Sequence, residues 1–154
     1  VDVGSGAGLP GIVLAIRRPD LRIDLVESLR RRTDFLSEVV DRLGVQGTVR
    51  VVHGRAEDDD VIELAGSSKW VTARAVAPLD RLVRWCLPLL VPGGHLLAMK
   101  GRRAVEELST HRRAVERAGG RNAQVLHRSV PGMVEPTWIV SIQRAEAKVR
   151  RESR

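Results

Sequence analysis

The sequence has little of several residue types, and each shortage excludes a class of protein. It has one cysteine, Cys86, in 154 residues, which excludes an intramolecular disulfide and a cysteine-rich zinc site. It has no tyrosine and one phenylalanine, so few rings are left for a base-stacking platform. Four histidines lie on different predicted elements, and we predict no metal site. No apolar run approaches the roughly 18 residues of a membrane span, so we expect no membrane partner.

The residues that are present suffice for one folded domain. Hydrophobic residues make up 43% of the chain, which is typical of a globular domain with a real core. The formal net charge is +7, and a basic surface favours polyanionic partners, nucleic acid first. Most of this charge is arginine, a bias that a GC-rich genome also produces, so the positions of the arginines matter more than their number. A single cysteine is consistent with a reducing cytoplasm, where we expect the protein to act.

The first eleven residues predict a short strand, a glycine-rich turn and the start of a helix whose positive end points at the turn. Gly4, Gly6 and Gly8 fall at alternate positions, where glycine allows positive φ and lets a ligand approach main-chain N–H groups. The dinucleotide fingerprint G-x-G-x-x-G would need a glycine at Leu9, so it is not met. The spacing G-x-G-x-G after Asp2 resembles the first motif of class I methyltransferases, which bind S-adenosylmethionine (SAM). There Asp2 would help to recognise the ammonium group; an ordinary tight turn is the alternative.

Apolar and turn-forming segments alternate along the rest of the chain. Further strands are predicted at about 21–27, 48–53, 69–74, 95–100, 123–130 and 137–143, and helices at about 12–16, 29–43, 79–90 and 104–118, with one more before the fourth strand. The alternation predicts an α/β fold: a doubly wound, mostly parallel seven-stranded sheet of the Rossmann-like class I methyltransferase type. The last two strands follow each other without a helix, which predicts one antiparallel strand. We place the domain at 1–144 and a charged, disordered tail at 145–154.

Within these elements the sequence also predicts burial and loops. The apolar residues of helix 29–43 recur at helical spacing and predict its buried stripe: Phe35, Leu36, Val39, Val40 and Leu43. Asp58-Asp59-Asp60 predicts a solvated loop, with a metal site as the alternative, and Pro92-Gly93-Gly94 predicts a turn. Cys86 and the three tryptophans are spaced like core residues: Trp70, Trp85 and Trp138.

Charged residues gather at the carboxyl ends of the predicted strands, the edge where open α/β sheets bind ligands. Glu27 closes the second strand 23 residues beyond Gly4, which suits hydrogen bonds to ribose hydroxyls; an acid at a helix N-terminus is the alternative. Five cations are predicted to ring the mouth and to contact RNA or cofactor: Arg31, Arg32, Arg74, Lys100 and Arg102. Such contacts would position RNA without reading its sequence, and solvation of the helices is the alternative. For Arg112, Arg113 and Arg117 we predict only solvation.

Several stretches together resemble one family, the bacterial small-subunit rRNA guanine-N7 methyltransferases (RsmG, also called GidB). The stretches are residues 2–12, 27–29, 35–36, 55–57, 73–79 and 99–101. Leu-Pro-Gly directly after the glycine turn and Arg-Ala-x-Ala after the fourth strand are not general to methyltransferases. The family's helical amino-terminal region is missing, and a chain that opens on Val1 inside a strand is expected to be cut at its amino end.

The resemblance implies a SAM-dependent enzyme that methylates N7 of one guanine in 16S rRNA, in the 530-loop and decoding region of the small subunit. It implies cofactor contacts from Gly4 and Leu9, from Ala56 and Glu57 beside the adenine, and from Arg74 at the mouth. The complete predicted cofactor set is Asp2, Gly4, Gly6, Gly8, Leu9, Glu27, Ala56, Glu57 and Arg74.

The sequence shows no evident general base, and the reaction that the resemblance implies does not need one. Guanine N7 carries a lone pair and no proton, so no general base is required and none is predicted. Arg74 and Lys100 are predicted to act through orientation and charge. The expected partner of the monomeric protein is 16S rRNA or the small ribosomal subunit. Two alternatives stay open: a SAM-dependent methyltransferase of a small molecule or protein, and a catalytically inactive basic RNA-binding module.

Overall fold

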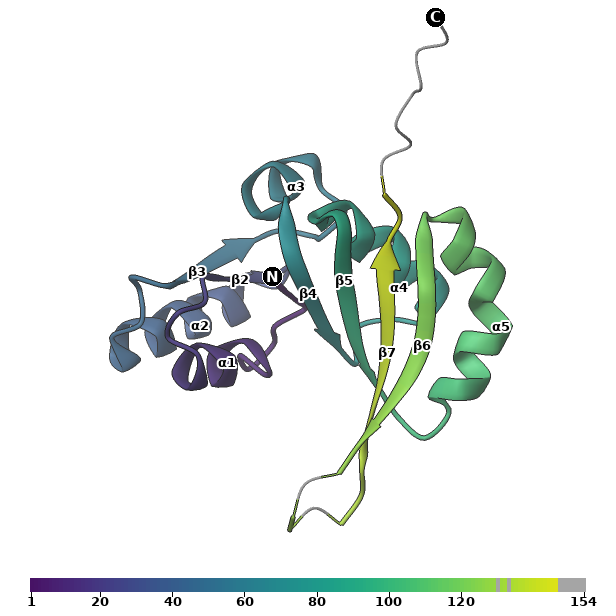
Figure 1. Cartoon of the computed structure of the whole chain (residues 1–154). Helices are drawn as coiled ribbons and strands as arrows, with labels where there is room; N and C mark the ends of the chain where they lie inside the picture. Colours follow the sequence, from purple (N-terminus) through teal and green to yellow (C-terminus); the bar gives the residue numbers. More distant parts are fainter. Residues whose placement is uncertain (130, 133, 147–154) are drawn as a thin grey trace, which may run out of the picture.

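Strands and helices alternate along the chain as the sequence predicts, up to a final hairpin (Figure 1). The structure, a computed structural model, describes residues 1–129, 131–132 and 134–146. The elements are β1 (Asp2–Val3), α1 (Gly11–Arg17), β2 (Ile23–Glu27), α2 (Arg30–Leu43), β3 (Val49–His53), α3 (Asp59–Ala65), β4 (Ser68–Arg74), α4 (Leu79–Cys86), the 3-10 helix η1 (Leu87–Leu89), β5 (Leu90–Lys100), α5 (Ala104–Arg117), β6 (Gly120–Arg128) and β7 (Thr137–Arg144). Val130 and all of the predicted tail except its first two residues lie outside the described residues.

The seven strands form one mixed sheet in the order β3-β2-β1-β4-β5-β7-β6. The pairs among β1 to β5 are parallel, and β7 runs antiparallel to both β5 and β6. The single antiparallel strand predicted from the missing crossover helix is therefore confirmed. In this order β2 and β3 lie on one side of β1, and β4 to β7 lie on its other side. This reversal makes the carboxyl end of β1 the switch point where doubly wound sheets bind ligands.

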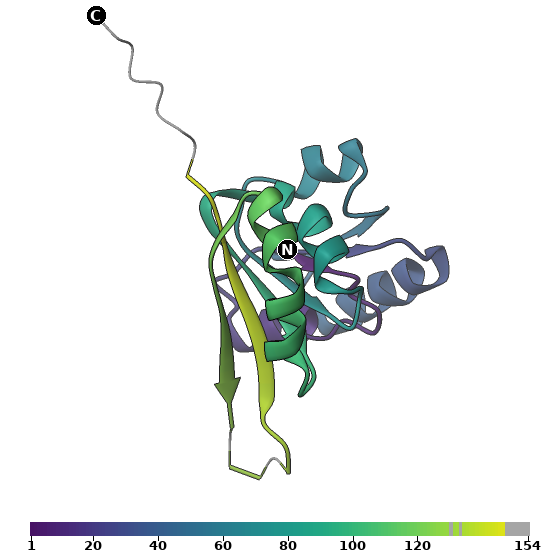
Figure 2. The ribbon, with the colours of Figure 1, turned by 90° about the vertical axis from the view of Figure 1, so that its right-hand side faces the viewer.

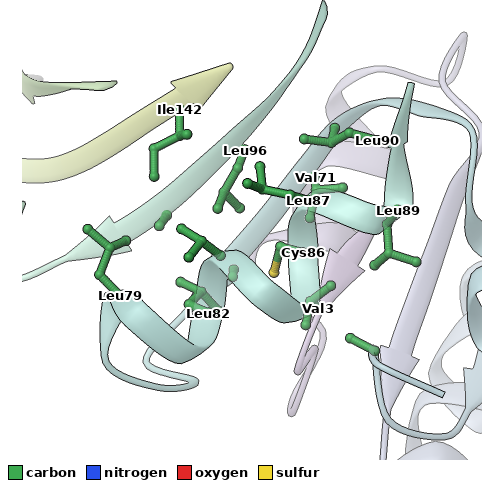
Figure 3. Close-up of a cluster of buried hydrophobic side chains, with 14 of the residues drawn as sticks. Val3, Val71, Leu79, Leu82, Cys86, Leu87, Leu89, Leu90, Leu96 and Ile142 are labelled. Atoms are coloured by element: carbon green, nitrogen blue, oxygen red, sulfur yellow. The ribbon is translucent and has the colours of Figure 1, made fainter. Parts of the chain in front are cut away.

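Two apolar clusters hold the layers together, one on each face of the sheet. On one face α1 and α2 cover β2 and β3, with Leu25 and Leu36 both fully buried between them. On the other face α4 packs across the sheet centre, and Figure 3 shows Leu79 and Cys86 in one buried cluster with Leu96 of β5. Burial of a leucine-sized side chain contributes about 1.5–3 kcal/mol. These two clusters fix β1 and its turn from both sides.

The face of β4, β5, β7 and β6 opposite α4 and α5 carries no helix among the described residues (Figure 1, Figure 2). Trp70 lies on this face with its residue 54% exposed, and its ring stacks on His95 at a centroid distance of 5.1 Å. The prediction that Trp70 is a core residue is therefore wrong, because alternation along β4 directs it to the uncovered face. No described helix combines the length and the apolar character that a membrane crossing requires.

Three local predictions are also wrong. Leu36 and Val40 are buried as expected, but Phe35 and Leu43 are 48% and 46% exposed, because α2 meets the sheet through a narrower stripe. Asp59 and Asp60 form the first turn of α3 rather than a loop, where acidic side chains favour the positive helix end. Residues 92–94 continue β5 instead of forming a turn, and the β4–β5 register shifts beside them.

Candidate functional site at the carboxyl edge of the sheet

The three alternating glycines have the positive φ angles that the sequence predicts: +66° at Gly4, +56° at Gly6 and +88° at Gly8. The space around them differs. A Cβ on Gly4 would lie 2.7 Å from Val76 Cγ2, and a Cβ on Gly8 would lie 2.5 Å from Ile12 Cγ1. A Cβ on Gly6 would meet only the Gly4 carbonyl oxygen, at 3.8 Å. Gly8 is thus required for packing against α1, whereas Gly6 marks the open side of the turn.

Most main-chain amides of the turn already donate hydrogen bonds within the protein. The bonds run from Gly4 N and Ser5 N to Val26 O (2.8 and 3.2 Å), from Gly8 N to Ser5 O (2.7 Å) and from Gly6 N to Glu27 Oε2 (3.0 Å). The expectation that these N–H groups face a ligand is therefore wrong for these four. A phosphate-binding turn presents free amides to the anion. A ligand can approach the backbone of this turn closely, but these four N–H groups are already used within the protein.

Asp2 supports the turn from inside the protein, and its carboxylate does not face the side that is open to a ligand. The residue is 1% exposed, its Oδ2 accepts a bond from Gly11 N at 3.1 Å, and its Oδ1 accepts one from Thr72 Oγ1 at 2.8 Å. Burial raises the pKa of Asp2 above its usual value, while the bonds from Thr72 and Gly11 oppose the rise. The carboxyl group therefore meets the amino end of α1 that was expected to point at a ligand. The predicted contact of Asp2 with an ammonium group is not supported by this geometry.

Glu27 joins the glycine turn to the start of α2. The residue is 3% exposed; its Oε2 accepts the bond from Gly6 N, and its Oε1 accepts one from Leu29 N at 3.0 Å. Arg32 Nη1 lies 3.7 Å from Oε2. The position thus has the character of the alternative considered above, an acid at a helix N-terminus. Each carboxylate oxygen has a further lone pair, so the ribose contact stays a prediction.

A cleft of about 210 Å³ opens beside the turn, on the face that α3 and α4 cover. Its walls come from the ends of β1 and β2, the segments after β3 and β4, and α4; they include Gly4, Ser28, Ala56, Glu57, Val76 and Trp85. Three predicted cofactor residues, Gly4, Ala56 and Glu57, therefore meet at one cleft. Pockets that enclose a drug-sized ligand span roughly 300–1,000 Å³. This cleft is smaller, and its volume suits one ring system of a ligand. Trp85, assigned to the core from the sequence, lines the cleft, and no feature of the sequence indicated this.

The two predicted electrostatic residues have different surroundings. Arg74 ends β4 and is exposed. Lys100 ends β5 with its side chain 12% exposed, and its Nζ lies 2.8 Å from both Ala77 O and Glu107 Oε1. The same Glu107 oxygen accepts a bond from Leu79 N at 2.8 Å. Lys100 therefore fixes the segment between β4 and α4, and this geometry does not support its predicted contact with RNA or cofactor.

The other predicted rim cations lie at the same edge, with different partners. Arg31 is exposed on α2, Arg102 pairs with Glu135 near the β6–β7 hairpin, and this hairpin reaches beyond the carboxyl ends of β4 and β5 (Figure 1, Figure 2). Leu9, in the predicted cofactor set, is 41% exposed at the turn. Ala75 has φ +53°, a strained conformation for alanine. Among the described residues no three histidine, cysteine or acidic side chains are grouped to hold a metal ion.

Solved structures with similar folds are methyltransferases of low sequence identity. A predicted O-methyltransferase from Agrobacterium tumefaciens superposes with a TM-score of 0.71 at 19% identity, covering 97% of this chain and 76% of its own. A methyltransferase from Pyrococcus furiosus superposes with a TM-score of 0.69 at 13% identity, covering 94% and 73%. At these identities the likeness establishes the fold alone, and it confirms the Rossmann-like methyltransferase architecture.

Sequence relatives are much closer. The protein named ribosomal RNA small subunit methyltransferase G from Salinispora tropica is 55% identical over 150 residues, 94% of this chain and 61% of its own length. The protein of the same name from Mycolicibacterium smegmatis is 47% identical over 147 residues, 96% and 62%. The chain thus spans about three-fifths of the length of these relatives. The model of the GidB family, described as rRNA small subunit methyltransferase G, matches residues 1–132. The chain belongs to the GidB family.

Proposed function

We propose that this chain is the SAM-binding domain, at residues 1–144, of an enzyme that methylates N7 of a guanine in 16S rRNA. The observation that carries the proposal is the cleft beside the Gly4–Gly8 turn, at the switch point of the sheet, in a chain of the GidB family. Neither the family nor the fold alone would assign a ligand to particular residues. The geometry of the turn supports the assignment that we propose.

The turn suits SAM better than a nucleotide with phosphates. SAM, when bound, supplies a methyl group on a positively charged sulfur, and it carries an ammonium group but no phosphate. Four turn amides are already occupied, so a phosphate would lack donors, whereas the nearby carboxylate of Glu27 favours a cation. Gly6 leaves open space on the outer side of the turn, which a larger side chain would fill. The residues present therefore fit this cofactor.

The cofactor contacts divide among three segments. The backbone at Gly4 and Gly6, with Leu9, lies against the amino-acid portion, and Glu27 accepts bonds from the ribose hydroxyls. Ala56 and Glu57 flank the adenine in the cleft. Gly8 and Asp2 act indirectly, because they hold the turn against α1. This assignment divides the residues predicted from the sequence into those that contact the cofactor and those that support the turn, and it moves Arg74 from the cofactor to the RNA.

Catalysis in this proposal rests on orientation and charge. A guanine N7 attacks without losing a proton, so the chain needs no base. Arg74, exposed at the end of β4, stabilises the approach of the anionic RNA at the mouth, and Arg31, Arg32 and Arg102 contact phosphates around it. Lys100 keeps the segment after Arg74 in place through Ala77 O and Glu107. The domain acts as a monomer on its RNA substrate.

Transfer of a radiolabelled methyl group from SAM to small-subunit rRNA, mapped by N7-sensitive chain cleavage, tests the proposal. The assay uses this chain and, in parallel, the full-length relative from Salinispora tropica as a positive control. Label at one guanine N7 is the expected result. Label on a small acceptor or a protein instead would support the first alternative. RNA binding without any SAM binding would identify an inactive RNA-binding module.

A further inference from the structure

We infer that Trp85 is a cofactor-contact residue whose indole ring forms the wall of the cleft on which the adenine ring packs. The inference rests on the proposed function and extends it to a residue outside the predicted site. Trp85 lies in the last turn of α4, whose buried residues are Leu79, Leu82, Val83 and Cys86. Those positions follow the spacing of a stripe that faces the sheet. Trp85 lies beside that stripe, half-buried, and lines the cleft.

The cleft has the shape and chemistry for a flat heteroaromatic ring. Trp85 is partly buried against the core cluster, so its position is fixed by packing rather than by a loop. The rest of the lining includes the small residues Gly4, Gly54 and Ala56, which leave room beside a large ring. No other aromatic side chain lines this cleft among the described residues. Aromatic rings prefer offset-stacked or edge-to-face contacts with one another. The indole ring of Trp85 can make either kind of contact with a purine.

The other two tryptophans lie elsewhere, which makes the inference measurable. Trp70 stacks on His95, and Trp138 of β7 lies against His127 with ring centroids 4.5 Å apart. Because neither lines the cleft, a ligand there should change the fluorescence of Trp85 alone. The chain holds three tryptophans and no tyrosine, so its ultraviolet emission arises from these three rings.

The experiment titrates the 154-residue chain with S-adenosylhomocysteine, adenosine and methionine, and follows tryptophan emission and calorimetric heat in parallel. Trp85→Phe, Trp70→Phe and Trp138→Phe are compared with the unmodified chain. Adenosine and S-adenosylhomocysteine should change the emission, and methionine should not. The change should vanish in Trp85→Phe and persist in the two controls. Trp85→Leu, which removes the ring, should weaken S-adenosylhomocysteine binding by about five- to tenfold, and Trp85→Phe should restore most of it.

Each outcome decides one claim. If heat shows binding but the emission change persists in Trp85→Phe, the indole does not contact the ligand and the inference is wrong. The same holds if Trp85→Leu binds with unchanged affinity. If Trp85→Leu does not fold, judged by circular dichroism, the emission of Trp85→Phe alone decides. If the unmodified chain takes up no S-adenosylhomocysteine by calorimetry, the proposed function fails, and the inference fails with it.

Discussion

Replacing Gly6 by alanine should weaken SAM binding strongly while leaving the fold almost intact. The added Cβ would meet no protein atom closer than the Gly4 carbonyl oxygen at 3.8 Å, so no steric clash contributes to the change in stability. The remaining cost is the positive φ of +56°, roughly 1–2 kcal/mol for a residue other than glycine. Alanine also reduces the entropy of the unfolded chain by about 0.4–1 kcal/mol. We expect the free energy of unfolding to fall by about 1 kcal/mol.

The loss of affinity has a different origin. The methyl group would project from the open side of the turn into the space that we assign to the cofactor. Displacing the cofactor by the width of a methyl group should weaken binding at least tenfold, or about 1.4 kcal/mol. Gly44→Ala is the matched control, because Gly44 has φ +66° and open space around it but caps α2 away from the cleft.

Urea unfolding and calorimetric titration with S-adenosylhomocysteine measure the two effects separately. Both variants should lose similar stability, and only Gly6→Ala should lose affinity. Equal affinities in Gly6→Ala and Gly44→Ala would show that the turn has a structural role only. A loss of several kcal/mol of stability in Gly6→Ala alone would contradict the open space that the structure shows beside it.

Three further predictions test the buried groups and hydrogen bonds that hold the site in place. Glu27→Gln should cost about 1–3 kcal/mol of stability in urea unfolding, because an amide has one oxygen for the two main-chain donors at Gly6 and Leu29; an unchanged midpoint would mean that these bonds do not brace the turn. Burial raises the pKa of the Cys86 thiol, so an aromatic disulfide reagent should label it only as fast as the protein unfolds, and rapid labelling of the native chain would refute its burial. Burial also raises the pKa of Asp2 above its unfolded value of about 3.9. The carboxyl group of Asp2 therefore contributes most at low pH, and its contribution falls as pH rises through the folded pKa. The unfolding free energy of the native chain minus that of Asp2→Asn should decline from pH 3 to pH 7 in urea titrations, and a rise would contradict the buried placement.

Sequence pattern sufficed for the layout of the fold because alternation and crossover rules are local. The absence of a helix between the last two predicted strands predicted the antiparallel strand β7. The spacing of the glycines predicted the positive φ angles of the turn. Spacing did not show which glycine faces a ligand, since that depends on where Ile12 and Val76 pack. Helical periodicity likewise overstated the buried face of α2, because only the contact with the sheet decides that Phe35 is exposed.

Charge and aromatic residues were harder to place from sequence. Lys100 was predicted at the correct edge, but its pairing with Glu107 depends on how α5 returns across the start of α4. Trp70 and Trp85 were both predicted from their spacing to be core residues. Their true places depend on which face of each element a neighbour covers, and a single sequence does not encode that in a local pattern.

The central claim is that the glycine turn and its cleft take a cationic nucleoside without phosphates. A calorimetric titration of this chain with SAM, and in parallel with ADP, tests it most directly. We predict saturable one-to-one binding of SAM and no detectable binding of ADP. Binding of ADP with no heat from SAM would contradict the account, because it would require the occupied amides of Gly4, Gly6 and Gly8 to serve a phosphate.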